Sequence, residues 1–224
     1  MTTLLAANIS RRTVLAGGGA LIVGFSLVPR GLLAQDAQNS GTQPTAELPL
    51  PGSLKDDPML DSWIRVDADG TITVFTGKAE LGQGVKTALI QLAAEELAVE
   101  PEAIHLVTAD TARTPNEGYT AGSHSMQDSG TAIMNATAQV RAILIEAAAI
   151  RLQLPAERLK ASGGAVTADD GRRLSYGDLV SDQMLHVRAE PRSDLLDPKD
   201  YRVIGKPVPR VDIPAKVTGG VAYV

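Results

Sequence analysis

A glycine-rich stretch near residue 80 separates a strand pattern from a helix pattern. Residues 77–84 read GKAELGQG, with an alternating run over 71–76 before them and an apolar helical period after them. The glycines therefore predict a tight loop that leads from a strand into a helix. The first turn of such a helix favours an anion such as a phosphate, and the carboxamide of Gln83 can both donate and accept a hydrogen bond. A purely structural turn has the same spacing, so the loop alone leaves both interpretations open.

Periodicity elsewhere predicts an α+β domain. A turn signal at 68–70 separates two strand patterns and favours a hairpin, and another strand is expected at 104–109. In the helix after Gly84, Glu95 and Glu96 are expected mostly on the side away from the apolar face. A longer helix is expected over 133–150. We expect a small mixed or antiparallel sheet with two main helices packed on one face.

The polar stretch from Asp110 to Ser129 is too long for a simple connection, which is typical of a functional loop. Asp128 or Ser129 could cap the helix after it. Two strand-loop-helix units in succession would let their loops converge on one elongated ligand.

Further along, residues 160–171 predict a small hairpin with a second turn, and Asp178 fits a capping box with Ser175. The last residues before Val224 have the pattern of a beginning strand.

Composition excludes several classes of function. The chain has 224 residues, a net charge of -5, 3% aromatic residues and no basic run, which gives nucleic acid neither an electrostatic footprint nor a stacking platform. It has no cysteine, so it offers no thiolate zinc site and no ligands for an iron-sulfur cluster. Its three histidines are far apart in sequence, which disfavours a metal held by protein side chains. A redox centre served by this chain would be a non-thiolate cofactor or belong to a partner.

The N-terminus has the pattern of an export signal. Adjacent Arg11 and Arg12 precede a short apolar stretch rich in glycine and alanine, and this resembles a twin-arginine signal. A general secretory leader or an N-terminal anchor is the alternative. We expect a periplasmic protein, or one on the periplasmic face of the inner membrane. The polar residues that follow, to about Pro58, predict a linker, and we expect the leader and the linker to be disordered.

Three stretches, taken in order, resemble the xanthine dehydrogenase and aldehyde oxidase family of molybdenum hydroxylases. FTGKAELGQG at 75–84 is similar to the glycine-glutamine-glycine molybdopterin loop of that family, and the serine-bearing loop at 119–130 is similar to one near the cofactor. Residues 205–223 carry the Arg-x-Asp and Lys-Val-Thr-Gly pattern that opens the hammerhead domain. The likeness is strongest to the two-component bacterial branch typified by isoquinoline 1-oxidoreductase and nicotinate dehydrogenase.

The N-terminal pattern predicts a signal segment at 1–37 and a linker at 38–60. The resemblance implies a molybdopterin-binding domain at 61–200 and the truncated start of a hammerhead domain at 201–224. It implies that Gln83 hydrogen-bonds an oxygen ligand of molybdenum and that Gly82 and Gly84 shape its loop. Further residues would line the cofactor cavity: Thr120, Gly122, Ser123 and Ser125.

The implied cofactor is molybdopterin, in a cytosine dinucleotide form, and the implied partners are a small iron-sulfur subunit and the C-terminal part of the large subunit. The substrate would be a small heteroaromatic compound or an aldehyde. The general-base glutamate of the family has no matching position here, so the isolated chain is expected to be inactive. A non-catalytic exported interaction module that kept the fold and lost the cofactor is the alternative, and a nucleotide-binding Rossmann protein is disfavoured because a third glycine is missing.

Overall fold

The computed structural model describes residues 48–180 and 186–220. The predictions for the signal segment, for residues 38–47 of the linker and for residues 221–224 lie outside the described residues. Two short 3-10 helices, Gly52–Lys55 and Leu60–Ser62, begin the described part. Leu54 and Leu60 from this segment are buried in the core, so the end of the expected linker is part of the folded unit.

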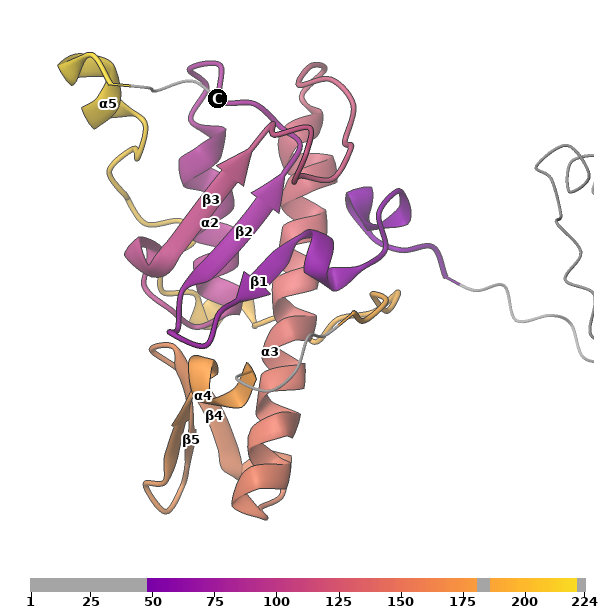
Figure 1. The fold of residues 1–224 in the computed structure, drawn as a ribbon, viewed down its shortest axis with the longest axis vertical. Coiled ribbons are helices and arrows are strands. Elements are labelled where there is room, and N and C mark those ends of the chain that lie inside the picture. Colours follow the sequence, from indigo (N-terminus) through magenta and orange to yellow (C-terminus); the bar gives the residue numbers. More distant parts are fainter. Residues whose placement is uncertain (1–47, 181–185, 221–224) are drawn as a thin grey trace, which may run out of the picture. The chain divides into compact units, whose positions relative to one another are not determined.

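A three-stranded sheet in the order β1-β2-β3 lies at the centre of the fold (Figure 1). Strand β1 (Ile64–Val66) pairs antiparallel with β2 (Ile72–Thr76), and β2 pairs parallel with β3 (Ile104–Thr108). All five residues of the central strand β2 are buried. The predicted hairpin and the predicted mixed sheet are both confirmed.

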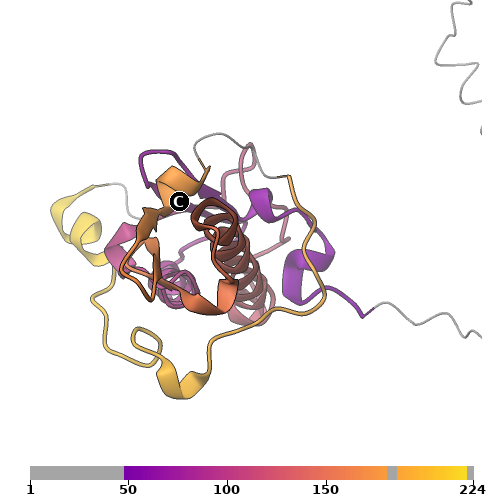
Figure 2. The same ribbon diagram turned by 90° about the horizontal axis from the view of Figure 1, so that it is seen from below.

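Two helices cover one face of this sheet, as expected (Figures 1 and 2). Helix α2 (Val85–Glu96) forms the crossover between β2 and β3 that a parallel pair requires. Helix α3 (Thr131–Leu152) packs beside it. Val74 of the sheet, Leu89 of α2 and Ile133 of α3 are fully buried in one hydrophobic core, which confirms the α+β class.

Helix α3 and the turn before it also have the length and composition of a membrane span, and in the described part of the chain only Ser125–Leu152 passes that test. Half of the apolar window is buried inside the protein against the sheet and α2. Its apolar character is therefore explained by its place in the core.

The polar side of α2 differs from the prediction. Glu95 and Glu96 are buried rather than exposed. The carboxylate of Glu95 accepts backbone N–H groups of residues 202–204 at 2.6–3.0 Å, and that of Glu96 accepts the N–H of Leu196 at 3.2 Å. A segment about a hundred residues later in the sequence covers this side of the helix, which the local periodicity of α2 does not show.

A second antiparallel sheet confirms the predicted hairpin with a second turn. It has the order β4-β5-β6, formed by Leu159–Ser162, Ala165–Ala168 and Arg173–Ser175. The short helix α4 (Tyr176–Val180) follows. Its capping box is confirmed: the Asp178 carboxylate accepts the Ser175 N–H at 3.0 Å, and the Ser175 hydroxyl accepts the Asp178 N–H at 3.0 Å.

The predicted beginning strand falls on the last residues, 221–224, which lie outside the described residues, and the described residues before them form a helix. Residues Ile213–Thr218 form the helix α5, with Pro214 in its first turn and Gly219 at its C-terminus with a φ of 77°. Proline at the start and a left-handed glycine at the end are the usual boundaries of a short helix. These boundary residues outweigh the strand propensity of the single valine in the helix, Val217.

Candidate functional site

Two loops meet where β2 and β3 end. The loop over 77–84 follows β2, and the loop over 109–124 follows β3. The Ala79 N–H donates to the Thr120 hydroxyl at 2.8 Å. The Lys78 ammonium donates to the backbone carbonyls of Glu117 and Tyr119 at 2.7 and 3.2 Å. Because the parallel strands end at the same edge of the sheet, both loops emerge together and meet as expected. A ligand shared by the two loops stays a prediction.

Glu117 joins the second loop to the end of β2. Its Oε2 accepts the hydroxyl of Thr76 and the N–H of Gly77, both at 2.8 Å. The Thr76 hydroxyl also lies 2.7 Å from that of Ser129, at the start of the second helical segment. The other oxygen of Glu117, Oε1, is buried without a hydrogen-bond partner. Glu117 therefore joins the second loop to the end of β2 through Oε2, while Oε1 can still accept a hydrogen bond.

Lys78 is a buried cation, only 1% exposed. Its partners named above are backbone carbonyls, which accept hydrogen bonds without adding a negative charge. Burial of an ammonium is costly unless its hydrogen bonds are made. Lys78 therefore holds the two loops together.

Replacing Lys78 by methionine should loosen this junction. The methionine fills most of the space but leaves the carbonyls of Glu117 and Tyr119 without their donor, at a cost of about 1–3 kcal/mol. Urea denaturation should show this loss of stability, and limited proteolysis should cleave the 109–124 loop faster. Lys55→Met, which removes an exposed lysine, is the control and should change neither.

The entrance of α2 does not offer the anion site that the sequence predicted. The Glu80 carboxylate is fully buried and accepts the N–H groups of Gly82, Gly84 and Lys86 at 2.7, 3.0 and 3.1 Å. Burial acts to raise the pKa of Glu80, but these three donors outweigh it and hold the pKa below its usual value. An internal carboxylate thus occupies the position where a phosphate was expected, because it is already attached to the loop and neutralises the same N–H groups.

Gln83 is exposed at the tip of the loop, between two glycines with φ angles of 106° and 85°. These left-handed values favour glycine. The side-chain oxygen of Gln83 accepts the N–H of Leu81 at 2.6 Å, and its nitrogen donates to the carbonyl of Ala79 at 2.9 Å. Since a carboxamide nitrogen carries two hydrogens, the loop fixes the orientation of the amide and leaves one N–H for a ligand.

The predicted residues of the second loop differ in their contact with the first loop. Thr120 meets the first loop through Ala79, as described above. Gly122 and Ser123 are exposed with φ angles of 66° and 63°, and Ser125 is half-buried at the start of a π-helical turn. In the described residues, no hydrogen bond joins the side chains of Ser123 or Ser125 to the first loop.

The predicted cap of the second helix is wrong. The π-helical turn Ser125–Gly130 leads directly into α3, whose start has no side-chain cap. Asp128 instead lies 3.1 Å from His124, and Ser129 bonds to Thr76. Because the chain is already helical before Thr131, the N–H groups that a cap would satisfy have backbone partners.

These loops fit a cofactor that brings its own metal ligands. Across 48–180 and 186–220, no group of three or more His, Cys, Asp or Glu side chains could hold a metal ion. What the loops offer is hydrogen-bonding capacity: the second N–H of Gln83, the hydroxyls of Ser123 and Ser125, and exposed backbone at glycines. Such a donor set suits the oxygen atoms and the pterin of a molybdenum cofactor, whose metal is held by the pterin dithiolene.

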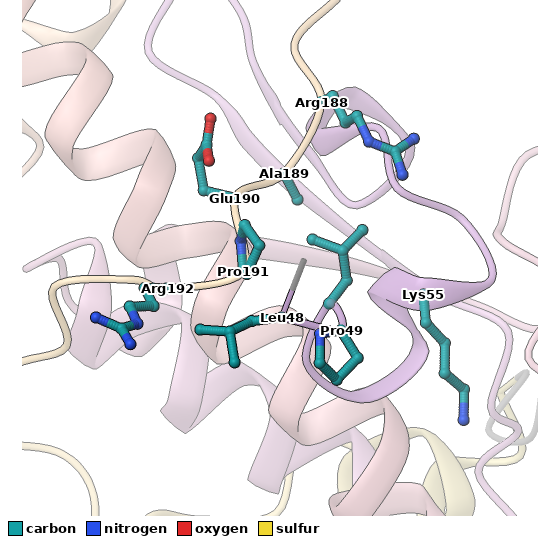
Figure 3. A pocket seen from close by; sticks show the side chains of 9 residues that line it. Leu48, Pro49, Lys55, Arg188, Ala189, Glu190, Pro191 and Arg192 are labelled. Carbon is teal, nitrogen blue, oxygen red and sulfur yellow. The ribbon is translucent and has the colours of Figure 1, made fainter. Parts of the chain in front are cut away.

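A wide groove elsewhere does not compete with this site. It has a volume of about 770 Å³ and lies between residues 48–55 and 188–192 (Figure 3). Its cationic side chains, Lys55, Arg188 and Arg192, point away from one another in Figure 3. Cationic ends that do not converge give no defined anion site.

Sequence reasoning missed the residues that hold the loops. Lys78, Glu80 and Glu117 were visible near the loops, but no pattern showed that they are buried or bonded to backbone groups. In the sequence, Arg210 stands out only as the arginine of the Arg-x-Asp pattern. In the structure, its guanidinium donates to the carbonyl of Gly82 at 2.9 Å. The one signal in the sequence that could have indicated these residues is that charged residues recur beside or near glycines in both loops.

Comparison with known proteins agrees with this interpretation of the loops. Residues 38–206 match the model of the molybdopterin cofactor-binding domain family. The chain is 35% identical over 216 residues to one of the subunits of nicotinate dehydrogenase from Pseudomonas putida, a match that covers 96% of this chain and 17% of that protein. It is 29% identical over 260 residues to the beta chain of isoquinoline 1-oxidoreductase from Brevundimonas diminuta, covering 96% of this chain and 31% of the relative.

More distant matches complete the comparison. A membrane-bound aldehyde dehydrogenase (pyrroloquinoline-quinone) of Gluconacetobacter polyoxogenes is 28% identical over 185 residues, covering 78% of this chain and 23% of that protein. Among solved structures, quinoline 2-oxidoreductase from Pseudomonas putida 86 matches with a TM-score of 0.45 at 27% identity, over 52% of this chain and 15% of that one. The chain thus spans less than a third of the length of each of these relatives. On the family match and the relative at 35% identity, the chain belongs to the molybdopterin cofactor-binding domain family of xanthine dehydrogenase and aldehyde oxidase type proteins.

Proposed function

We propose that this chain is the N-terminal, cofactor-binding segment of a molybdenum hydroxylase large subunit. The complete enzyme would hydroxylate an N-heterocycle with oxygen from water or oxidise an aldehyde. The observation that carries the proposal is the amide of Gln83, which the loop holds in one orientation with one N–H available at an exposed tip. The names of the relatives, which refer to nicotinate, isoquinoline and an aldehyde, support this substrate range.

In this proposal the described residues bind and orient rather than perform the chemistry. Gln83 would donate its remaining N–H to an oxygen ligand of molybdenum, while Gly82 and Gly84 keep the backbone close to the cofactor. Thr120, Gly122, Ser123 and Ser125 would line the cavity on the side of the second loop. When bound, the cofactor would supply the metal that accepts electrons from the substrate and binds the water-derived oxygen.

The cytosine dinucleotide form of the cofactor, the iron-sulfur partner and the export route also belong to the proposal. The absence of cysteine supports a separate electron-transfer subunit, because this chain cannot ligate a cluster with thiolates. The paired arginines Arg11 and Arg12 support export by the twin-arginine route to the periplasm or its membrane face. That route carries folded proteins, which suits a protein that acquires its cofactor before export.

The function is tested by purifying the subunit, as its gene encodes it, together with the proteins that copurify with it. Molybdenum measured by mass spectrometry near one atom per subunit, with cytidine monophosphate released on acid hydrolysis, is the expected result. Pyrroloquinoline quinone without molybdenum would overturn the molybdenum assignment. A subunit that carries neither cofactor would favour the non-catalytic interaction module.

Gln83→Ala should lower the molybdenum-dependent turnover by about 10–100-fold, because it removes the oriented donor without removing core contacts. Gln83→Glu is the matched isostere and should fail similarly, since a carboxylate cannot donate the hydrogen bond. The free energy of unfolding should stay within about 0.5 kcal/mol of wild type in both, since the side chain is exposed. Unchanged turnover in both variants would contradict the role assigned to Gln83.

A further inference from the structure

The segment that opens the hammerhead pattern lies across the Gln83 loop. The Arg210 guanidinium donates to the Gly82 carbonyl at 2.9 Å, although the two residues are 128 positions apart. Val211 donates its N–H to the Thr87 hydroxyl at 3.1 Å, in the first turn of α2. Two contacts, one from a side chain and one from the backbone, therefore attach this segment to the loop and to the helix that follows it.

Arg210 is held in place by a buried carboxylate. Its Nε and Nη2 bond to the two oxygens of Asp212 at 2.9 and 2.6 Å, and Lys216 bonds to the same carboxylate. Asp212 is 3% exposed. A bidentate arginine-carboxylate pair fixes the plane of the guanidinium, so the N–H that reaches Gly82 has a defined direction.

The contact of Arg210 with the first loop is made at the peptide group between Gly82 and Gln83. Glu80 accepts the N–H of Gly82 and of Gly84, so the carboxylate holds the loop from its inner side. Arg210 binds the carbonyl of Gly82, which belongs to the same planar peptide group as the nitrogen of Gln83. Its Nη2 also lies 3.7 Å from Glu80 Oε1, and its guanidinium would lie 3.4 Å from a Cβ on Gly84. Two glycines with left-handed φ give the loop little stiffness of its own, so these contacts decide its conformation.

We propose that Arg210 is a positioning residue for Gln83: by binding the Gly82 carbonyl it sets the peptide plane that directs the Gln83 amide toward the cofactor. The assignment of the ligand rests on the proposed function, whereas the positioning of the loop does not. The start of the hammerhead segment thereby becomes a structural part of the cofactor loop. A guanidinium is required because one group must meet Asp212 with two N–H donors and still reach Gly82, which an ammonium cannot do in the same geometry.

The first test is hydrogen exchange of the full-length subunit, measured by mass spectrometry on peptides that cover 79–86. Arg210→Gln should raise exchange in this segment roughly tenfold, while the peptides of β2 and α3 keep their wild-type rates. Arg210→Lys keeps the positive charge beside Asp212 and Glu80, and should still raise exchange there. The control, Arg192→Gln, removes an exposed arginine of the groove in Figure 3 and should change nothing.

Wild-type exchange over 79–86 in Arg210→Gln would overturn the proposal. If Arg210→Gln unfolds the subunit, the lysine variant decides: raised exchange confined to the loop supports positioning, and unchanged exchange overturns it. The comparison between variants is made without substrate and does not require the cofactor to be identified.

The second test asks whether Arg210 acts through Gln83. Turnover is measured with nicotinate, isoquinoline and benzaldehyde as probes, together with molybdenum content. Arg210→Gln should lower kcat about tenfold at unchanged molybdenum content, and should lower it no further in a chain that already carries Gln83→Ala, because residues that act through one another are non-additive. Independent, additive losses would overturn the proposal. Gln83→Ala with wild-type turnover would refute the proposed function instead, and would leave the exchange result standing.

Discussion

Replacing Arg141 by methionine should lower the free energy of unfolding by about 3–5 kcal/mol, because it leaves a buried carboxylate without its counter-ion. The Arg141 guanidinium donates to the backbone carbonyl of Glu96 at 2.6 Å and to its carboxylate at 2.7 Å, and also to the carbonyl of Asp194. Glu96 is fully buried. The change also removes the contact that joins α3 to the segment after residue 193, so urea denaturation should show the loss directly.

The loss should depend on pH with a definite sign. Burial raises the pKa of Glu96 above its ordinary value of 4.5, and Arg141 acts against that rise. Without Arg141 the folded-state pKa rises further, so the folded state resists ionisation while the unfolded chain ionises normally. The difference in stability between variant and wild type should therefore be smallest below about pH 4.5 and grow as pH rises through the folded-state pKa of Glu96.

The double variant Arg141→Met with Glu96→Leu is the control, because it removes both charges together. Its stability should recover to within about 1–2 kcal/mol of wild type, since replacing a buried ion pair by apolar side chains is often nearly neutral. A double variant as unstable as Arg141→Met alone would show that the ion pair is not the source of the loss.

Replacing Glu80 by alanine should destabilise the protein by about 2–4 kcal/mol, because three backbone N–H groups lose a charged acceptor. The helix entrance would then expose its positive end, so an added anion such as sulfate should restore part of the stability. Glu146→Ala removes an exposed carboxylate on α3 and should change stability by less than about 0.5 kcal/mol.

The contribution of Glu80 should also follow pH, with the opposite sign to that of Glu96. Its folded-state pKa lies below the ordinary value of 4.5. It therefore stabilises the fold fully above about pH 4.5, and that stabilisation is lost as pH falls through the folded pKa. The difference between wild type and Glu80→Gln, measured at each pH, should shrink in that direction. A constant difference down to about pH 3 would contradict the assignment.

Local patterns were sufficient for the elements of the fold. The hairpin of β1 and β2, the helices α2 and α3 and the capping box at Asp178 all depend on residues close to one another in sequence. Periodicity and turn chemistry report such short-range preferences. The start of α3 was less predictable, because a π-helical turn stands where a side-chain cap was expected.

The sequence located the candidate site but did not predict the contacts that hold it together. The order of strand, glycine loop and helix placed Gln83 at a loop tip, and two such units in succession implied that their loops meet. That Glu80 fills the anion position expected for a ligand was not predictable, since a glutamate near a helix start is as often solvated. The roles of Lys78 and Glu117 depend on contacts across about forty residues.

The sequence by itself determined the class of fold, the two loops and the family to which they belong. Each of these follows from apolar spacing, glycine positions or short motifs, all of which are properties of neighbouring residues. Only the tertiary structure decided which charges are buried and what they hold: Glu95 and Glu96 against the later segment, and Lys78 between the loops. It also decided that the partly exposed Arg210 lies over Gly82. The physical reason is that a buried charge is stable only beside its hydrogen-bond partners, and the partners of Lys78, Glu95 and Glu96 that hold these segments together lie 39 to 109 residues away in the chain.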